Sequence, residues 1–289
     1  MTPTRKERRE FERRAQFGNL TFRAPEKHYV RLNGWVPVCR AMKEHLKDED
    51  LRYFSLCGRE PFDVILLFRE RILIPNRMRP NVAICDVETE ALTAASEAIT
   101  RAKFGPVAKF SISLEDLVLG QNYLHDQFLG ILPFHVYNFD FTKQIFYYRR
   151  PIRTRMWKTI ERVIELQSQH NQDFDLFVTS RSYPPEINQN VVKILLDTMN
   201  HNIRQVAGLL ELINGRGINS FDELFQQDFT EFFLRSLPKQ ILQKALDCGF
   251  LLRLHGLYRY KKPGYHIAKW CLGFRRPQKG KPRGSDQNW

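Results

Sequence analysis

The sequence predicts an α/β fold: a mostly parallel seven-stranded sheet with helices on both faces, a C-terminal antiparallel hairpin and a helical N-terminal extension. Five short apolar segments alternate with longer helical stretches, and strands that run parallel need such helical crossovers between them. Two further apolar segments flank the turn residues Lys261–Gly264, which indicates a hairpin after the last helix. With 289 residues, of which 43% are hydrophobic, the chain can bury a core of this size.

The first predicted strands and helices alternate regularly. Strand one, Tyr53–Leu56, precedes a helix over Pro61–Arg71, whose proline lies in the first turn, where its missing N–H costs nothing. Strand two, Val82–Cys85, precedes an alanine-rich helix over Thr89–Thr100. The remaining predicted elements, in chain order, are strands at Lys109–Ser113 and Phe134–Phe141, a helix at Trp157–Gln169, a strand at Asp175–Ser180, helices at Gln189–Asn214 and Phe221–Ala245, and strands at Gly249–Gly256 and Tyr265–Phe274.

We expect three regions in the chain. Residues 1–50 form a basic helical extension, with a charged helix over Thr4–Arg14 and an amphipathic one over Trp35–Leu46. Residues 51–274 form the sheet domain. Residues 275–289 are basic and contain glycine and proline, which predicts a flexible tail.

The net charge of +13 and a pI near 9.6 predict a positive surface that attracts polyanions. Nucleic acid, or a complex that contains it, is the expected partner. The alternatives are a basic protein with no such partner, or one that docks on an acidic protein.

Several classes of protein are not expected. No apolar run approaches the roughly 20 residues that span a bilayer, and the basic N-terminus lacks the apolar core of a secretory signal. The five cysteines include no C-x-x-C pair, so we expect buried reduced thiols and no metal site. A cytoplasmic protein, or a nuclear one in a eukaryote, is the default.

Two strand ends carry groups suited to a nucleotide. Strand one is followed by Gly58, where a backbone can approach a ligand closely, and strand two by the acids Asp86 and Glu88. A strand, a glycine turn, a helix and a second strand that ends in an acid follow one another in the folds that hold an adenosine ribose. The turn in this chain has a single glycine. The simpler interpretation is that both acids stabilise the start of the helix near Thr89.

This order resembles the class I S-adenosylmethionine-dependent methyltransferases, whose Rossmann-type sheet has seven strands with the last two at one end. The resemblance covers Tyr53–Phe274 and implies S-adenosylmethionine as the cofactor. It implies five cofactor-binding residues: Cys57 and Gly58 at the methionine end, Asp86 or Glu88 at the ribose, and Asp116 at the adenine.

The resemblance also places the catalytic or substrate-orienting residues, Asn138 and Asp140, at the end of strand four. The segment Asn138–Phe141 keeps the amide, acid and aromatic groups that orient a nucleobase, but it lacks the two prolines of enzymes that methylate exocyclic amines. Two prolines follow strand five instead. If the strands were miscounted, Asp175–Pro185 would be the catalytic strand.

Basic residues cluster after strand four and in the hairpin turn. We expect nucleic-acid contacts from Arg149, Arg150, Arg153, Arg155, Lys261 and Lys262, with further basic groups in the tail. Aromatic residues at Phe146–Tyr148 would stack bases beside these arginines, or would simply belong to the edge of the core.

Simpler interpretations apply to three further residues. Asp140 would be a turn residue, and His135 and His266, inside apolar segments, would be hydrogen-bonded core histidines.

Two functions therefore remain open. One is a methyltransferase that acts on RNA or DNA. The other is a methyltransferase-like scaffold without activity in a nucleoprotein complex. The acids favour the first function, whereas Arg59 and Glu60, which replace further glycines and would crowd a cationic cofactor, favour the second.

Overall fold

The computed structural model describes residues 25–76, 79–120, 123–141, 143–146, 155–187, 189–205 and 219–277. Its elements are α2 (Pro25–Val30), the π-helix η1 (Arg31–Trp35), α3 (Val36–Leu46), β1 (Tyr53–Leu56), α4 (Phe62–Arg69), β2 (Val82–Asp86), α5 (Thr89–Arg101), β3 (Ala108–Ser111), α6 (Leu114–Leu119), α7 (Tyr123–Gly130), β4 (Val136–Asp140), α8 (Arg155–Gln169), β5 (Phe174–Ser182), the short 3₁₀ helix η3 (Pro184–Glu186), α9 (Gln189–Gln205), α11 (Phe221–Gln227), α12 (Phe229–Asp247), β6 (Leu251–Lys262) and β7 (Tyr265–Arg275).

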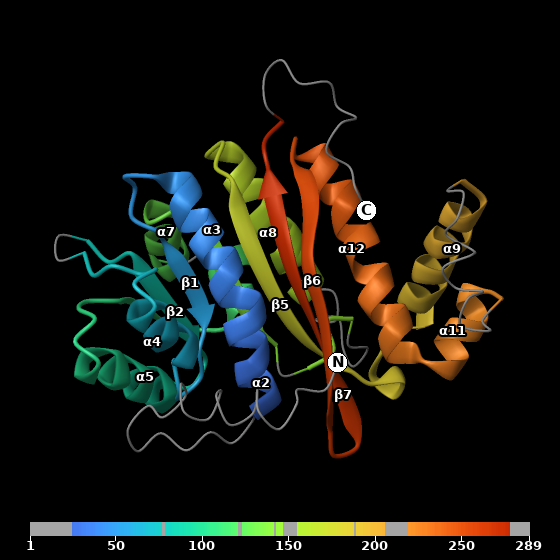
Figure 1. Cartoon of the computed structure of the whole chain (residues 1–289), viewed down its shortest axis with the longest axis horizontal. Coiled ribbons are helices and arrows are strands. Elements are labelled where there is room, and N and C mark those ends of the chain that lie inside the picture. Colours follow the sequence, from blue (N-terminus) through green and yellow to red (C-terminus); the bar gives the residue numbers. More distant parts are fainter. Residues whose placement is uncertain are drawn as a thin grey trace.

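The seven strands form one sheet in the order β3-β2-β1-β4-β5-β7-β6 (Figure 1). Strands β1 to β5 pair in parallel, and β7 pairs antiparallel with both β5 and β6. The predicted fold class is therefore confirmed. The carboxyl ends of the parallel strands point to the bottom of Figure 1, where the tip of the β6–β7 hairpin also lies.

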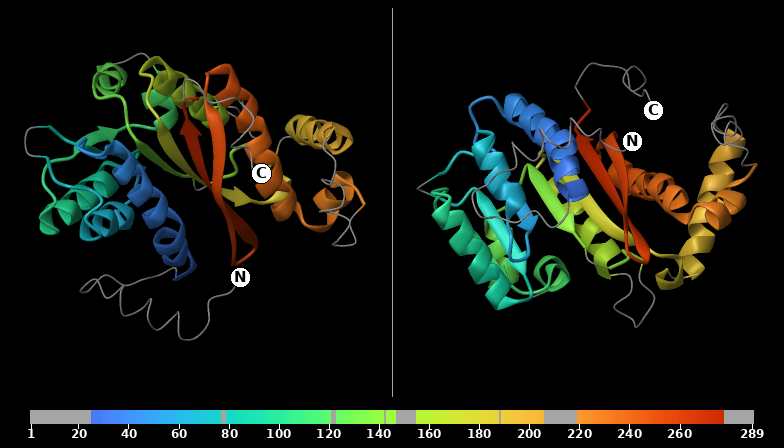
Figure 2. Two further views of the ribbon diagram at one scale, coloured as in Figure 1. Left: turned by 45° about the horizontal axis from the view of Figure 1, so that its top comes forward. Right: turned by 60° about the horizontal axis from the view of Figure 1, so that its bottom comes forward.

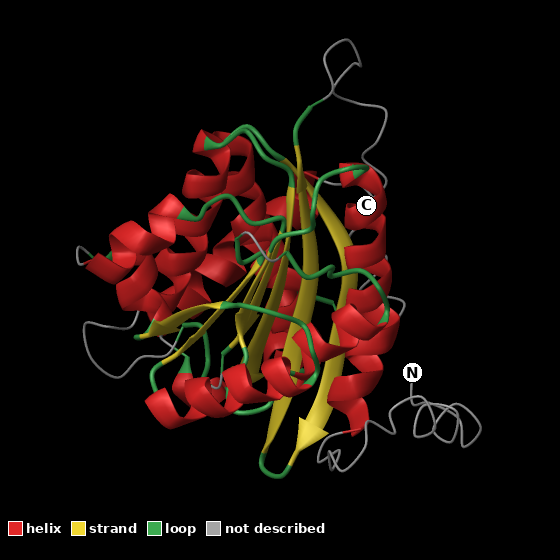
Figure 3. Ribbon diagram, turned by 90° about the vertical axis from the view of Figure 1, so that its left-hand side faces the viewer, coloured by secondary structure: helices red, strands yellow, loops and turns green. Residues whose placement is uncertain are grey.

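Helices cover both faces of the sheet (Figure 3). On one face, α2, η1, α3, α4 and α5 pack against side chains such as Tyr53, Val136 and Phe177. The ring of Trp35 in η1 stacks on Phe177, with 5.0 Å between centroids and 7° between planes. On the other face, the helices from α6 to α12 enclose a larger core that is rich in phenylalanine. The helices before β1 are thus part of the packed domain.

The structure corrects two details of the expected elements. Two helices, α6 and α7, lie between β3 and β4, where none was predicted. The hydroxyl of Ser113 accepts the N–H of Asp116 and so caps α6. The helix expected over Phe221–Ala245 is two helices, because Asp228 leaves the helical conformation and caps α12 by accepting the N–H of Glu231.

The charged helix predicted over Thr4–Arg14 and most of the predicted tail lie outside the described residues. None of the helices in the described ranges is both long and apolar enough to cross a membrane. All five cysteines are unpaired, and three of them are buried while Cys57 and Cys248 are partly exposed.

Candidate functional site

A cavity of about 550 Å³ lies at the carboxyl edge of the sheet. It is bounded by α2 and η1, by the ends of β1, β4 and β5, and by the tip of the β6–β7 hairpin. Its lining residues are Lys27, His28, Arg31, Cys57, Arg59, Glu60, Phe62, Asp140, Phe141, Thr179, Arg181, Tyr260, Lys262, Tyr265 and Ile267. The right-hand view of Figure 2 turns this edge toward the viewer. In open α/β sheets, ligands bind at this edge.

Strand register brings the polar residues of the cavity together. Asp140 at the end of β4 pairs with Thr179 of β5, which pairs with Lys269 of β7. Residues in register across a sheet project to the same face. An acid, a hydroxyl and an amine from three strands therefore form one row at the face that α2 and η1 cover.

The ammonium group of Lys27 forms an ion pair with Asp140, whose side chain is 18% exposed. Burial alone would raise the pKa of Asp140. The nearby cations Lys27, Lys269 and Arg31 outweigh burial and hold this pKa well below its ordinary value. Asp140 is therefore an ionised carboxylate whose charge is already matched by a residue more than one hundred positions earlier in the chain.

Lys269 is fully buried, and its pKa is lowered from 10.5 to about 7. The first cause is burial, with further lowering by Lys27 and Arg31 and partial compensation by Asp140. Its amine lies 4.8 Å from the ring centroid of Trp35 and 5.7 Å from that of Tyr260. Among the described residues it has no hydrogen-bond partner.

Arg31 is buried at the wall of the cavity and is held in place by residues of α2, η1 and α4. Its Nη1 atom lies 3.2 Å from Nδ1 of His28, and its guanidinium lies near the rings of Trp35 and Phe62. Burial, with the charges of Arg31 and Lys27, lowers the pKa of His28 to about 3. The neutral imidazole therefore accepts a hydrogen bond from Arg31.

Asn138, predicted to orient a substrate, lies inside the sheet and is 2% exposed. Its amide donates to Oδ2 of Asp63 at 2.7 Å. The hydroxyls of Tyr53 and Ser55 donate to the same oxygen at 2.7 and 2.6 Å. Asn138 therefore helps to hold a buried carboxylate of α4 against β1 and β4, and it is not among the residues that line the cavity.

Of the predicted cofactor residues, Cys57 lines the cavity and Gly58 follows it with a φ of +55°. A Cβ atom at Gly58 would have open space around it, so the chain leaves room above this turn. Burial raises the pKa of the Cys57 thiol, as do the charges of Asp63 and Asp86.

The two acids Asp86, at the end of β2, and Glu88 lie at the start of α5. Oδ1 of Asp86 accepts the N–H of Glu88 at 2.9 Å, and Glu88 is the N-cap residue of α5, without a capping bond from its own side chain. Asp86 therefore contributes to the helix start, as the simpler interpretation expected, and it also lies at the strand end to which the resemblance assigns the ribose.

Two predicted site residues, Asp116 and Arg155, form an ion pair with each other. The hydrogen bond from Arg155 is the main cause of the lowered pKa of Asp116. The structure thus joins an expected adenine contact to an expected phosphate contact.

The predicted basic residues are only partly described. Lys262 lines the cavity and Lys261 is exposed next to it, whereas Arg149, Arg150 and Arg153 lie outside the described residues.

The strand count is right, since β4 lies beside β1 and β5 comes next. The alternative strand also contributes, because Thr179 and Arg181 of β5 line the same cavity.

The structure tests three of the simpler interpretations. His135 is a core histidine, 3% exposed, whose Nδ1 accepts the backbone N–H of Arg52 at 3.0 Å. His266 is exposed near the hairpin tip, so its expected place in the core is wrong. Phe146 is buried against Trp157 and Phe233, which makes it a residue of the core edge.

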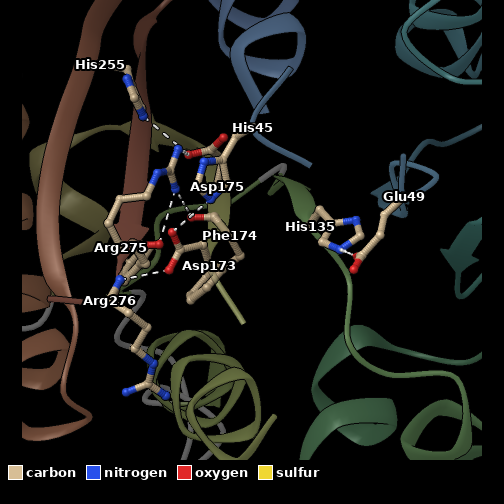
Figure 4. Close-up of polar contacts among 10 residues, drawn as sticks. His45, Glu49, His135, Asp173, Phe174, Asp175, His255, Arg275 and Arg276 are labelled. Carbon is tan, nitrogen blue, oxygen red and sulfur yellow. Dashed lines mark hydrogen bonds and ion pairs between the residues drawn. The ribbon is translucent and has the colours of Figure 1, made fainter. Parts of the chain in front are cut away.

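A second polar cluster lies at the opposite edge of the sheet (Figure 4). Arg275 donates to the fully buried Asp175 at 2.6 Å, and Nε2 of His255 lies 3.3 Å from the same oxygen. His255 reaches this position from a bulge in β6, and Gly273 provides the space, because a Cβ there would collide with the imidazole. The cluster ties β5 to the hairpin.

Five residues at the cavity were not singled out from the sequence: Lys27, Arg31, Thr179, Arg181 and Lys269. Lys269 alone carried a usable signal. It lies in the middle of the apolar segment Tyr265–Phe274, where a lysine is unusual for a strand paired on both sides.

A family model described as PP_RS20740-like matches residues 21–261 of the chain. No curated protein matches the chain.

Several solved structures are similar in outline. One is a putative class I S-adenosylmethionine-dependent methyltransferase from Listeria monocytogenes, with 12% identity, 97% of this chain and 71% of that chain covered, and a TM-score of 0.45. Another is an rRNA methylase from Streptococcus thermophilus, with 10% identity, 88% and 99% covered, and a TM-score of 0.40. A third is magnesium protoporphyrin IX methyltransferase from Synechocystis PCC 6803 with bound SAM, with 9% identity, 93% and 91% covered, and a TM-score of 0.39.

Likenesses this distant say nothing about the substrate of this chain. The observed strand order, with its antiparallel hairpin at one edge, is the arrangement that the resemblance to class I methyltransferases implies. The resemblance is therefore confirmed at the level of the fold.

Proposed function

The chain belongs to the PP_RS20740-like family, and from that premise and its site we propose a methyltransferase-like protein that binds nucleic acid at the carboxyl edge of its sheet and takes S-adenosylmethionine as methyl donor. The observation that carries the proposal is the excess of positive charge in a cavity that begins at the glycine turn after β1.

The charge of the cavity follows from its lining. Its cations are Lys27, Arg31, Arg59, Arg181 and Lys262, and its carboxylates are Glu60 and Asp140. His28 adds no charge near pH 7, because its pKa is about 3. Five positive charges against two negative ones leave an excess of three. Such a concave, positive site favours phosphate groups.

The residues beside the cavity fit the adenosine part of the cofactor. The space above Gly58 is open, and Asp86 makes only one hydrogen bond among the described residues, to the N–H of Glu88. The proposal has Asp86 accept from the ribose hydroxyls, while Cys57 and Gly58 face the methionine part. When bound, the cofactor supplies an electrophilic methyl group.

Within this proposal the chain's own residues bind and orient the acceptor. Asp140 is ionised and at the cavity wall, so it accepts a hydrogen bond from the acceptor group once Lys27 turns aside. Asn138 supports β4 from behind through Asp63. Methyl transfer requires mainly positioning and exclusion of water, so few catalytic groups are expected.

The second candidate is a scaffold without activity in a nucleoprotein complex. Two ion pairs favour it: Lys27 occupies Asp140, and Arg155 occupies Asp116. Both acids that the resemblance assigns to substrate and adenine are thus already matched inside the chain.

Calorimetry with S-adenosylmethionine and S-adenosylhomocysteine distinguishes the two candidates. Loss of a ribose acceptor in Asp86→Ala should weaken binding by about 1–3 kcal/mol, as for a hydrogen bond to a charged group. Glu90→Ala, an exposed acid in the first turn of α5, is the matched control and should bind as the wild type does. If neither compound binds the wild type, the methyltransferase proposal fails and the scaffold takes its place.

The nucleic-acid part is tested by gel-shift titration at two salt concentrations. Affinity should fall steeply with salt, and charge reversal of Arg149 and Arg150 should weaken binding and flatten the salt slope. Reversal of Arg101 and Lys103, at the far end of α5, changes the net charge equally and should have a smaller effect. If nothing binds at low salt, the nucleic-acid part is wrong.

A further inference from the structure

Polar atoms without partners gather around the cavity. Within the described ranges, the buried atoms near it that make no hydrogen bond include Nε of Arg31, Oγ1 of Thr179, Nε of Arg181 and Nζ of Lys269, together with one acceptor, Oε2 of Glu186, whose other oxygen accepts from Arg181. The first four form one group. All four can donate, and three of their residues line the cavity. Buried donors without acceptors are costly, and here they outnumber the buried acceptor that lacks a donor.

The charged side chains around the cavity also indicate that an anion would be stabilising there. Lys27, Arg31 and Lys269 all act on the single carboxylate of Asp140. That carboxylate is already paired with Lys27, so among the described residues the positive charges of Arg31 and of protonated Lys269 have no ion-pair partner of their own at the cavity. A buried excess of positive charge destabilises the fold unless an anion compensates it.

The two arginines are fixed in advance. Arg181 is held by Glu186 at 2.9 Å and lies 4.3 Å from the ring centroid of Tyr265. Arg31 is held by His28 and two aromatic rings. They approach from different walls, Arg31 from η1 and Arg181 from β5, with Thr179 between β4 and β7. Donors that are already positioned lose little freedom on binding a phosphate.

The size of the cavity limits the ligand. About 550 Å³ is within the usual range for a small-molecule site, the size class to which a single nucleotide belongs.

From these contacts we propose that the cavity binds the phosphate of a single nucleotide, with Arg31 donating from η1 and both Arg181 and the hydroxyl of Thr179 donating from β5. The identification of this nucleotide as part of the substrate rests on the proposed function, whereas phosphate binding itself does not. A free nucleotide and the phosphorylated end of a strand share this chemistry.

Calorimetry on the full chain tests the proposal with five probes: adenosine monophosphate, adenosine, inorganic phosphate, a short oligonucleotide with a 5′-phosphate and the same oligonucleotide without it. We expect adenosine monophosphate to bind, inorganic phosphate to bind more weakly and adenosine not to bind in this cavity. Tighter binding of the phosphorylated oligonucleotide than of its unphosphorylated form identifies a strand end, and equal binding of the two identifies the free nucleotide.

Thr179→Val is the decisive variant. It removes a buried hydroxyl that has no partner among the described residues, so the fold should be as stable as the wild type or more stable. Affinity for adenosine monophosphate should fall about 10-fold, as expected for one hydrogen bond to a charged group. Arg181→Lys keeps the charge but loses the guanidinium geometry, and it should reduce affinity at least as much.

Thr100→Val, on an exposed face of α5, is the matched control and should leave binding unchanged. If Thr179→Val and Arg181→Lys both bind adenosine monophosphate as the wild type does, or no phosphate-bearing probe binds at millimolar concentration, the phosphate site is wrong. S-adenosylmethionine titrated into the same variants separates the two proposals. Intact cofactor binding with lost phosphate binding in Thr179→Val supports the phosphate site by itself, and phosphate binding without cofactor binding overturns only the proposed function.

Discussion

Replacement of Lys269 by Met should stabilise the protein. The substitution keeps an unbranched side chain of similar length and removes an amine that is fully buried without a hydrogen-bond partner in the described part of the chain. Lys269 differs in this respect from the other buried polar groups of the same face, such as Asp63, which accepts three hydrogen bonds.

The magnitude follows from the pKa of Lys269, which falls from 10.5 in the unfolded chain to about 7 in the fold. At about 1.36 kcal/mol per pKa unit, this fall corresponds to a penalty on the order of 5 kcal/mol for the protonated amine. Between pH 7 and 10.5 the unfolded chain binds the extra proton, so the stability of the wild type rises with pH in this window. The gain from Lys269→Met is therefore largest below pH 7 and shrinks as the pH approaches 10.5.

Urea denaturation of wild type and variant at pH 6 and pH 9 measures both effects. We expect a gain of about 2–5 kcal/mol at pH 6, smaller by about 2–3 kcal/mol at pH 9. Lys109→Met, at an exposed position of β3, is the matched control and should change stability little at either pH. A Lys269→Met variant that is less stable than the wild type, or equally stabilised at both values, would refute the argument.

Three further predictions concern buried groups and are measured by chemical denaturation. Asp63→Ala removes the carboxylate that three buried donors share and should lower the free energy of unfolding by about 3–5 kcal/mol. The exposed control Asp48→Ala should lower it little. A decrease below 1 kcal/mol in Asp63→Ala would contradict the importance of this hydrogen-bond network. Arg275→Met leaves the buried carboxylate of Asp175 without its closest cation and should lower the free energy of unfolding by about 3–5 kcal/mol. Adding Asp175→Asn should restore part of this stability, because it removes the unpaired charge. If the double variant is no more stable than Arg275→Met, the charge is not the cause. Burial, followed by nearby cations, lowers the pKa of His135 to about 4, so the free energy of unfolding should fall by about 3 kcal/mol as the pH drops from 6.5 to 4. His135→Asn should remove this part of the loss. If the free energy of unfolding of the variant falls with pH as steeply as that of the wild type, His135 is not the cause.

The strands and most helices were predictable because their signals are local. Apolar runs of four or five residues ended by a glycine or an acid marked β1 and β2, and an alanine-rich periodic stretch marked α5. The helices α6 and α7 were missed because each is short and has few residues with which to show a period. The break at Asp228 was missed because the apolar pattern continues through it, and only its capping bond shows where one helix ends and the next begins.

The candidate site was predictable only in part. Asp140 and Cys57 line the cavity and Gly58 lies next to Cys57, because all three lie at or just after strand ends and parallel strands bring their carboxyl ends to one edge. Asn138 satisfied the same rule, yet a carboxylate from α4 engages its amide. Sequence spacing gives the position of a side chain along a strand but not the partner that occupies it.

The sequence by itself thus determined the α/β class, the order of the strands along the chain, the terminal hairpin and the edge of the sheet where the cavity lies, because these depend on residues within a few positions of one another. Only the tertiary structure decided the character of the site. Packing of α2 and η1 on the sheet places Lys27 and Arg31 beside Asp140. Pairing of β7 with β5 places Lys269 directly across from Thr179 on the neighbouring strand. Electrostatic interactions depend on distance in space and on burial, and neither can be read from separations of more than one hundred residues along the chain.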